Sequence, residues 1–202
     1  MKVLSPFGPK IAQLKLDKSL INKINKEVDR ISSQKKLTKK YDYSKKLVGQ
    51  VKQEIQLPKN FIKKYLAKKI NQSIKEFIKS TTGKTTKTIK IKNFWVVSQF
   101  SHEYNPVHYH DGHVSGVGYL KIPKFTTNKK SLTTNGTIDF INGNKMFLNN
   151  SIFNHNPRVG DVILFPNYLM HTAYPFTNKG ERRSFSFNAE IDNSIANVFK
   201  NE

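Results

Sequence analysis

The first part of the chain carries apolar residues at the spacing of an α-helix. Within residues 17–33 they recur at every third or fourth position, which places them on one helical face; they are Leu20, Ile21, Ile24, Val28 and Ile31. Asp17 stands where an N-cap residue is expected. The pattern therefore predicts an amphipathic helix that packs against another element.

A second, longer helix is predicted for residues 58–82. Pro58 and Asn60 mark its start, and Gly83 lies just beyond its end. One face is apolar along its length: Phe61, Ile62, Tyr65, Leu66, Ile70, Ile74, Phe77 and Ile78. A face of this kind is typical of a helix laid against a sheet. Residues 35–56, between the two helices, show weaker periodicity and are interpreted as a polar connector.

The pattern changes after about residue 87, where short β-rich runs are separated by Gly, Pro, Asn and Asp. The predicted strands lie in residues 87–100, 114–123, 136–143, 145–153, 160–166 and 182–191. This number of short strands favours a sandwich or a barrel-like double sheet. We expect one α+β, mainly β domain over residues 1–202, with a mainly helical part at 1–86 and a β core at 87–195.

The amino-acid composition excludes several kinds of catalytic and metal site. The chain of 202 residues has no cysteine, which excludes disulfides, thiol catalysis and thiolate metal sites and fits a reducing compartment. Nothing in it matches the nucleophile motif Gly-x-Ser-x-Gly. No apolar run is long enough for a signal peptide or a membrane span, so a soluble, cytoplasmic protein without membrane contacts is expected.

The formal net charge of +21 is concentrated in the first part of the chain. Residues 1–92 hold 25 of the 35 Lys and Arg residues, against 6 acidic residues. Such a surface could bind nucleic acid or another anionic partner. However, the cations are almost all Lys, and only Arg30 supplies the guanidinium that base recognition usually requires. We favour compositional bias as the explanation of the charge, and the oligomeric state is left open.

Three of the six histidines lie within the segment "HYHDGH", residues 108–113. On an extended segment His108 and His110 project from the same face, as two ligands of one metal ion would. His171 follows the apolar strand "GDVILFP" and can supply a third ligand. Asp111 is the alternative to His110, because a β-bulge could turn its carboxylate toward the same point.

The remaining histidines are assigned lesser roles. His113 and His102 are expected to lie beside the site without ligating the metal, or at the surface. His155 stands between Asn154 and Asn156 and is expected to be solvated in a loop.

The last predicted strand, "RRSFSFN", has two distinct faces. Arg182, Ser184 and Ser186 alternate onto one face, and Arg183, Phe185 and Phe187 take the other. An inward guanidinium is costly to bury unless an anion pairs with it. Metal ligands next to such a cation indicate a site for a dicarboxylate that chelates the metal.

The blocks "H-x-H…SGVGYLKIP", "GDVILFP…LMH" and "RRSFSFN", in this order, resemble the 2-oxoglutarate/Fe(II)-dependent oxygenases of bacteria and cyanophages. The resemblance covers about residues 93–191 and implies a double-stranded β-helix (jelly-roll) core. It also implies an oxygenase that uses Fe(II), 2-oxoglutarate and O₂, hydroxylates an unidentified substrate and releases succinate and CO₂. The general pattern of the superfamily, H-x-[DE]…H, has a carboxylate where His110 stands.

The resemblance also implies roles for individual residues. Fe(II) would be held by His108, His110 and His171, with Asp111 as the alternative to His110. The distal carboxylate of 2-oxoglutarate would lie on Arg182 and Ser184, with help from Tyr119. Aromatic side chains are expected to line the mouth of the site: Trp95, Tyr104, Tyr109 and Tyr168.

Two other functions remain open from the sequence. A cupin-type barrel would bind metal without turning over 2-oxoglutarate. A nucleic-acid-binding module would use the basic helical part and keep the barrel as a scaffold. The oxygenase and the nucleic-acid-binding function can coexist if the substrate of the oxygenase is a nucleic acid or an anionic protein.

Overall fold

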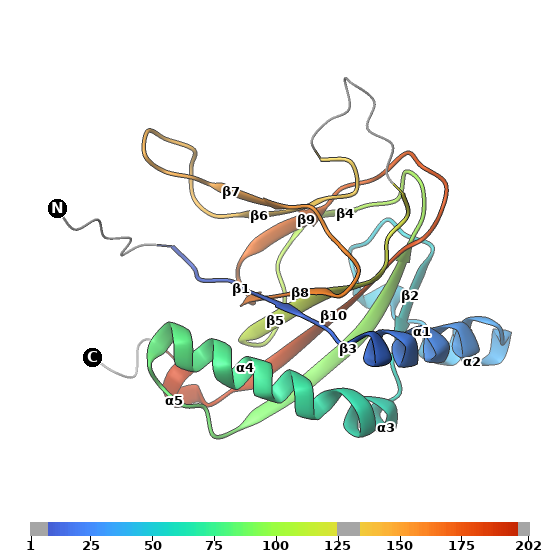
Figure 1. Cartoon of the computed structure of the whole chain (residues 1–202), viewed down its shortest axis with the longest axis horizontal. Coiled ribbons are helices and arrows are strands. Elements are labelled where there is room, and N and C mark those ends of the chain that lie inside the picture. The colour runs from blue at the N-terminus through green and yellow to red at the C-terminus, as the bar shows by residue number, and fades with distance from the viewer. Residues whose placement is uncertain (1–7, 125–133, 198–202) are drawn as a thin grey trace.

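The computed structural model describes residues 8–124 and 134–197. Within them two antiparallel sheets face each other, one ordered β1-β8-β5-β10-β3-β2 and the other β4-β9-β6-β7 (Figure 1). The large sheet comprises β1 (Ala12–Lys15), β2 (Gln53–Gln56), β3 (Ile89–Gln99), β5 (Val114–Lys121), β8 (Asp161–Pro166) and β10 (Arg182–Ile191). The small sheet comprises β4 (Asn105–His108), β6 (Ile138–Ile141), β7 (Ile152–His155) and β9 (Met170–Ala173). The predicted double sheet is confirmed.

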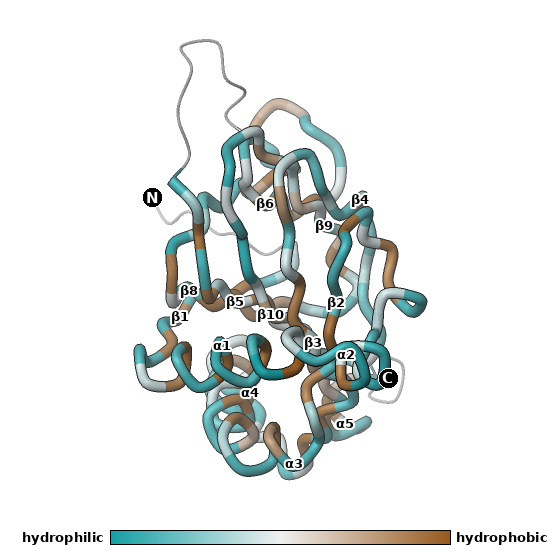
Figure 2. The backbone as a smooth tube through the Cα atoms, turned by 90° about the vertical axis from the view of Figure 1, so that its right-hand side faces the viewer, coloured by the Kyte–Doolittle hydropathy of each residue, from teal (hydrophilic) through white to brown (hydrophobic). Residues whose placement is uncertain are grey.

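The helices lie on one side of the large sheet, as Figure 2 shows from the side. They are α1 (Lys18–Ser32), α2 (Lys35–Tyr41), α3 (Lys59–Phe61), the π-helical η2 (Ile62–Leu66), α4 (Ala67–Thr82) and α5 (Asn193–Ala196). The short helix η1 (Ser44–Lys46) lies in the segment before β2. Both predicted helices are present, although Asp17 makes no side-chain capping bond to α1. Gly83 ends α4 in the left-handed conformation, with φ 72°, which glycine adopts without a steric penalty.

The main core fills the space between these helices and the outer face of the large sheet. Ile24 of α1 and Ile74 of α4 are fully buried in the same cluster as Phe185 and Phe187 of β10. Gly118 of β5 makes room for one of these rings, because a Cβ there would lie 2.2 Å from Phe185. The glycine-spaced run of β5 is therefore a packing requirement of the phenylalanines beside it.

The connector interpretation of residues 35–56 is wrong. The segment contains α2, η1 and β2, and β2 pairs antiparallel with β3, placing Glu54 opposite Val97. The inner face of β2 borders a cavity instead of the core, so its polar residues hide the strand from a hydrophobicity pattern. Together with β1, β2 brings the N-terminal part of the chain into the same sheet as the β core.

The prediction for residues 145–153 is correct only at its end, where β7 begins at Ile152. Phe147 and Leu148 are 92% and 91% exposed, so the apolar run before β7 is not a buried strand. No helix in the described ranges, 8–124 and 134–197, combines the length and apolar character needed to cross a membrane.

Candidate active site

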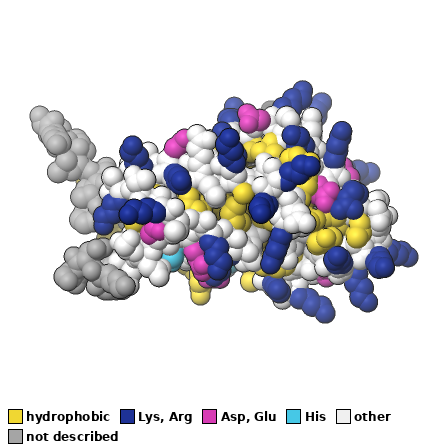
Figure 3. Space-filling model, turned by 90° about the horizontal axis from the view of Figure 1, so that it is seen from below, with side chains coloured by type: hydrophobic (Ala, Val, Ile, Leu, Met, Phe, Trp, Pro, Cys, Tyr) yellow, Lys and Arg dark blue, Asp and Glu magenta, His cyan; other side chains and the backbone are white. Residues whose placement is uncertain are grey.

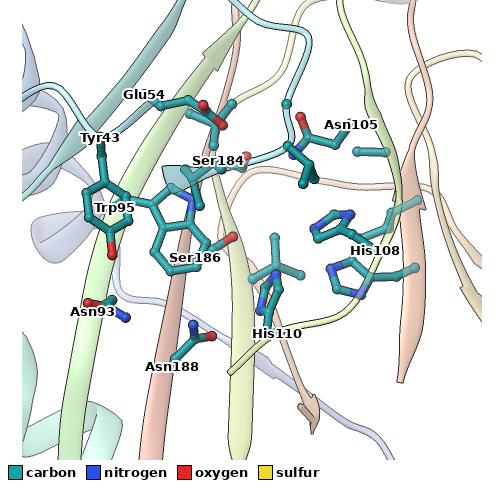
Figure 4. Close-up of a pocket in the computed structure, with 18 of the residues that line it drawn as sticks. Tyr43, Glu54, Asn93, Trp95, Asn105, His108, His110, Ser184, Ser186 and Asn188 are labelled. Carbon is teal, nitrogen blue, oxygen red and sulfur yellow. The ribbon is translucent and has the colours of Figure 1, made fainter. Parts of the chain in front are cut away.

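A cavity of about 620 Å³ opens between the two sheets. Its floor is the inner face of the large sheet, and one wall is the end of the small sheet (Figure 4). The segment around η1 contributes Tyr43, Leu47 and Gly49 to the lining. The cavity therefore combines residues from the N-terminal part of the chain and from the β core.

Three histidines meet at one wall of this cavity. His108 of β4 and His171 of β9 are direct partners across the small sheet, and their ring centroids are 4.3 Å apart. His110 lies two residues beyond β4, with its ring centroid 4.7 Å from that of His171. Each of the three offers one nitrogen, and these nitrogens all lie within 4.8 Å of one another. The structure thus brings together the three histidines singled out in the sequence.

Hydrogen bonds fix the orientation of two of these rings. His108 Nδ1 lies 2.7 Å from the Pro106 carbonyl oxygen, and His171 Nδ1 lies 3.0 Å from that of Leu169. Because a carbonyl oxygen only accepts, each Nδ1 carries the proton and donates it, which leaves Nε2 with a free lone pair. His110 Nδ1 is buried without a hydrogen-bond partner among the described residues. An orphaned buried nitrogen beside two free lone pairs fits a divalent metal ion.

The three imidazoles are neutral at physiological pH. Burial lowers the pKa of His108 and lowers that of His171 well below its ordinary value. Burial and the charge of His108 together lower the pKa of His110 to about 3. Neutral imidazole is the form that binds metal, and nitrogen ligands suit Fe(II). The donor set therefore fits the ion that the sequence resemblance implies.

Asp111 lies outside the histidine cluster. Its side chain is 71% exposed, and its carboxylate pairs with Lys92 Nζ at 2.7 Å. The hydrogen bond from Lys92 holds the pKa of Asp111 below its ordinary range. Asn167 holds the backbone on both sides of His110: the His110 N–H donates to the Asn167 carbonyl oxygen at 2.9 Å, and Asn167 Nδ2 donates to the His110 carbonyl oxygen at 3.2 Å. The bulge that would bring Asp111 to the metal is absent.

Arg182 lines the same cavity and is buried, with 2% exposure. Its Nη1 donates to the Gly136 carbonyl oxygen at 2.5 Å, and its Nη2 donates to Gln99 Oε1. Its Nε is buried and has no partner among the described residues. Ser184 lines the same cavity. A buried guanidinium with an unused donor is suited to an anion.

Tyr119 of β5 lines the cavity directly opposite Ser184 in the sheet register. It is 2% exposed, and burial raises the pKa of its hydroxyl, which therefore stays protonated and can donate a hydrogen bond. Arg183 takes the other face of β10, where its guanidinium pairs with Asp29 at 2.8 Å and Glu181 at 2.6 Å. The two faces of this strand lie as the alternation in the sequence predicts.

The structure also locates the other histidines. His102 is exposed, and His113 is half-buried, where its Nδ1 accepts the Ile191 N–H at 3.0 Å. The expectation of a solvated His155 is wrong. This residue ends β7 with 7% exposure, and its Nε2 lies 3.2 Å from Asp161 Oδ2. Pairing of β7 with β6 turns the ring inward, which the asparagines around it do not reveal.

Trp95 and Tyr109 line the cavity as expected, whereas Tyr104 and Tyr168 are exposed outside its lining. Several residues that line the cavity were not predicted from the sequence: Tyr43, Glu54, Asn93, Gln99, Asn105, Asn167 and Asn188. Polar residues on one face of β3 and β10 could have indicated that Asn93, Gln99 and Asn188 line a cavity. Glu54 could not be predicted in this way, because its strand was not recognised in the sequence.

The double sheet and the cluster of three histidines fit the class of the non-haem iron oxygenases that use 2-oxoglutarate. Residues 93–188 match the family model described as "Putative 2OG-Fe(II) oxygenase". Over these residues the chain is similar to that family, and it is an Fe(II)- and 2-oxoglutarate-dependent dioxygenase, with O₂ as the usual cosubstrate. No curated protein matches its sequence.

Solved structures of this class have the same fold. A viral collagen prolyl hydroxylase from Paramecium bursaria Chlorella virus-1, in complex with 2-oxoglutarate, is 15% identical with a TM-score of 0.57, over 89% of this chain and 94% of its own. HygX from Streptomyces hygroscopicus with nickel and 2-oxoglutarate bound is 12% identical with a TM-score of 0.58, over 89% and 81%. A Pseudomonas putida prolyl-4-hydroxylase is 12% identical with a TM-score of 0.56, over 90% and 91%. The expected jelly-roll core is confirmed.

Proposed function

We propose that His108, His110 and His171 hold the Fe(II) ion of this oxygenase. The observation that carries this assignment is their convergence to within 4.8 Å beside the cavity, with Nε2 of two rings free and Nδ1 of the third unpaired. The side chain of Asp111 is exposed and pairs with Lys92, so His110 is favoured as the third ligand. The iron site is then formed from three neutral ligands.

We propose further that Arg182, Ser184 and Tyr119 bind the distal carboxylate of 2-oxoglutarate. Gly136 and Gln99 hold the Arg182 guanidinium in place, and the unpaired Nε–H is available to the anion. The protonated hydroxyl of Tyr119 and that of Ser184 add neutral donors beside it. The cation and the two hydroxyls line the cavity that the histidines border, so one dicarboxylate can contact both groups.

His108, His110 and His171 would hold an Fe(II) ion, which would supply the chemistry that couples oxidative decarboxylation of 2-oxoglutarate to succinate and CO₂ with oxidation of the prime substrate by O₂. We propose that the product is a hydroxylated substrate. The role of the chain is to hold both reactants and to exclude water. Two apolar side chains of the lining, Val117 of β5 and Ile138 of β6, keep the region around the cosubstrate dry. The cytoplasm of the producing cell, or of its host if the gene is a phage gene, supplies both Fe(II) and 2-oxoglutarate.

The test is an anaerobic titration of the purified protein with Fe(II) and then 2-oxoglutarate. Chelation of the metal by the 2-oxo acid should produce a weak visible metal-to-ligand charge-transfer band, and admission of O₂ should yield succinate. Metal binding without the band or without succinate would contradict the assignment and favour a metal-binding barrel of another function.

A further inference from the structure

Glu54 is a buried carboxylate on the floor of the cavity. It lies on β2, opposite Val97 of β3, and Val97 is in turn opposite Ser184 of β10. Glu54 therefore shares a row of the inner sheet face with the residue assigned to 2-oxoglutarate, but at the edge strand. Figure 4 shows its side chain extending across the cavity toward Asn105.

The carboxylate of Glu54 forms no ion pair with any of the described residues. The residue is 2% exposed, and its Oε2 is buried without a hydrogen-bond partner among the described residues. Burial and the negative charge of Asp42 raise its pKa to about 7. Lys46, the lysine in the lining, lies instead against the ring of Tyr43, 5.3 Å from its centroid. A buried carboxylate without a partner is costly, and such a group is expected to meet its partner in a ligand.

A second unpaired acceptor lies beside it. Asn105 Oδ1 is buried without a partner in the part of the chain that the structure describes. A Cβ on Gly49 would lie 2.7 Å from both Asn105 Oδ1 and Glu54 Oε1, so the absence of a side chain at Gly49 lets the two acceptors converge. Two acceptors at one point complement a group that carries several N–H donors.

The wall next to Glu54 is aromatic. Tyr43 and Trp95 lie side by side with ring centroids 5.9 Å apart, and both line the cavity (Figure 4). Aromatic faces stabilise cations, and they also hold the apolar stem of a lysine- or arginine-like group. The other carboxylate of the lining, Asp111, is already paired with Lys92 and leaves Glu54 as the free anion among the described lining residues.

We infer that Glu54, with Asn105, binds a cationic nitrogen group, an ammonium or a guanidinium, of the prime substrate and thereby selects it. The inference rests on the proposed function, because it places the prime substrate in the cavity next to the iron and 2-oxoglutarate. The ionised carboxylate supplies the charge, Asn105 supplies a second acceptor, and Tyr43 and Trp95 contact the stem of the group. Glu54 is a specificity-determining residue, and the oxidised carbon lies elsewhere on the same substrate.

The experiment compares small compounds that differ in charge: n-butylguanidinium and n-butylurea have nearly the same shape, and n-butylammonium is a more compact cation. The Fe(II)- and 2-oxoglutarate-loaded protein is titrated anaerobically by calorimetry at pH 8 with n-butylguanidinium, n-butylammonium and the neutral n-butylurea. We expect at least one cation to bind roughly tenfold more tightly than n-butylurea, as a charge-assisted contact implies. N-acetylarginine methylamide is added to test a peptide as the source of the cation. Binding of this compound but not of n-butylguanidinium would identify a peptide substrate, and binding of n-butylguanidinium alone would identify a free small molecule.

Glu54→Gln should reduce this preference to about twofold or less, because the shape is kept and the charge is lost. Gly49→Ala should weaken it as well, since the new Cβ displaces both acceptors. Glu76→Gln on the exposed face of α4 makes the same charge change away from the cavity and should leave the preference intact.

The outcomes separate the two proposals. Failure of the wild-type protein to bind Fe(II) or 2-oxoglutarate contradicts the proposed function. Normal binding of both without a preference for cations, or with an unchanged preference in Glu54→Gln, overturns the role of Glu54. An unchanged preference in Glu54→Gln is the result expected if Glu54 and Asn105 have only a structural role.

Discussion

His108 and His171 are register partners on the neighbouring strands β4 and β9, and their rings are 4.3 Å apart. Each ring is oriented by a carbonyl oxygen two residues before it, at Pro106 and Leu169. The same local geometry therefore occurs twice, once on each strand, and it directs both Nε2 atoms toward one point. Ligands held in this way are preorganised by backbone that the fold already fixes.

The arrangement predicts which substitutions abolish iron binding. His108→Ala and His171→Ala should each abolish Fe(II) binding, because two remaining ligands cannot hold the ion firmly. His110→Ala should do the same, whereas Asp111→Ala should leave Fe(II) affinity unchanged, since Asp111 pairs with Lys92. Anaerobic Fe(II) titration measures all four variants. Loss of binding in Asp111→Ala together with retention in His110→Ala would reverse the assignment of the third ligand.

Much of the β core could be predicted from the sequence, because its strands bury one face and alternate clearly. β10 is an example: Phe185 and Phe187 enter the core, and Arg182 and Ser184 border the cavity. The spacing of two histidines on one extended segment likewise predicted their common face. These signals are local, so they do not need knowledge of the tertiary structure.

The parts of the fold and site that could not be predicted depend on contacts between segments that are distant in the sequence. β2 has polar residues on both sides, and only its pairing with β3 makes it a strand. Glu54 enters the cavity through this pairing, and His155 becomes buried through the pairing of β7 with β6. A hydrophobicity pattern records burial in the apolar core and does not detect burial beside a polar cavity.

The lysine-rich helical side of the molecule gives the next prediction. Figure 3, seen from this side, shows Lys and Arg side chains spread over the face, with hydrophobic and acidic ones between them. If the surplus of lysine reflects compositional bias, replacing exposed lysines by Gln should leave succinate production and thermal stability unchanged. Exposed charges contribute little to stability, and Gln favours helices nearly as well as Lys does. A suitable set is Lys35, Lys36, Lys39, Lys63 and Lys68.

The competing interpretation of this face has its own measurement. Binding of a short duplex DNA by the wild-type protein, falling tenfold or more between about 50 and 200 mM salt, would identify a phosphate-binding surface. Loss of that binding in the five-lysine variant would assign it to the helical side. We expect neither result.

Glu54 should make the stability of the protein depend on pH. Its pKa is raised from 4.5 to about 7 in the folded protein, so the folded state holds its proton more tightly than the unfolded state. The destabilising effect is absent below about pH 4.5, grows between about pH 4.5 and 7, and is constant above that. It corresponds to ~3 kcal/mol at most.

Glu54→Gln removes this titration. The variant should be more stable than the wild-type protein at pH 8, and the difference should vanish near pH 4.5. Denaturant unfolding at both pH values measures it. The other charged groups near this carboxylate, Asp42, Lys46 and Asp111, are common to both proteins and cancel in the comparison. An equal stability difference at the two pH values would show that Glu54 is not the titrating group.

Arg182 and Arg183 are neighbours on β10 with opposite surroundings, and they form a matched pair. Arg182→Lys keeps the charge but cannot contact Gly136, Gln99 and a carboxylate at once. The apparent affinity for 2-oxoglutarate should fall about tenfold or more, while Fe(II) affinity stays close to that of the wild type. Arg183→Lys should leave 2-oxoglutarate affinity unchanged and lower the melting temperature, because the guanidinium joins β10 to Asp29 of α1. Greater loss of 2-oxoglutarate affinity in Arg183→Lys would refute the placement of the cosubstrate beside Arg182 and Ser184.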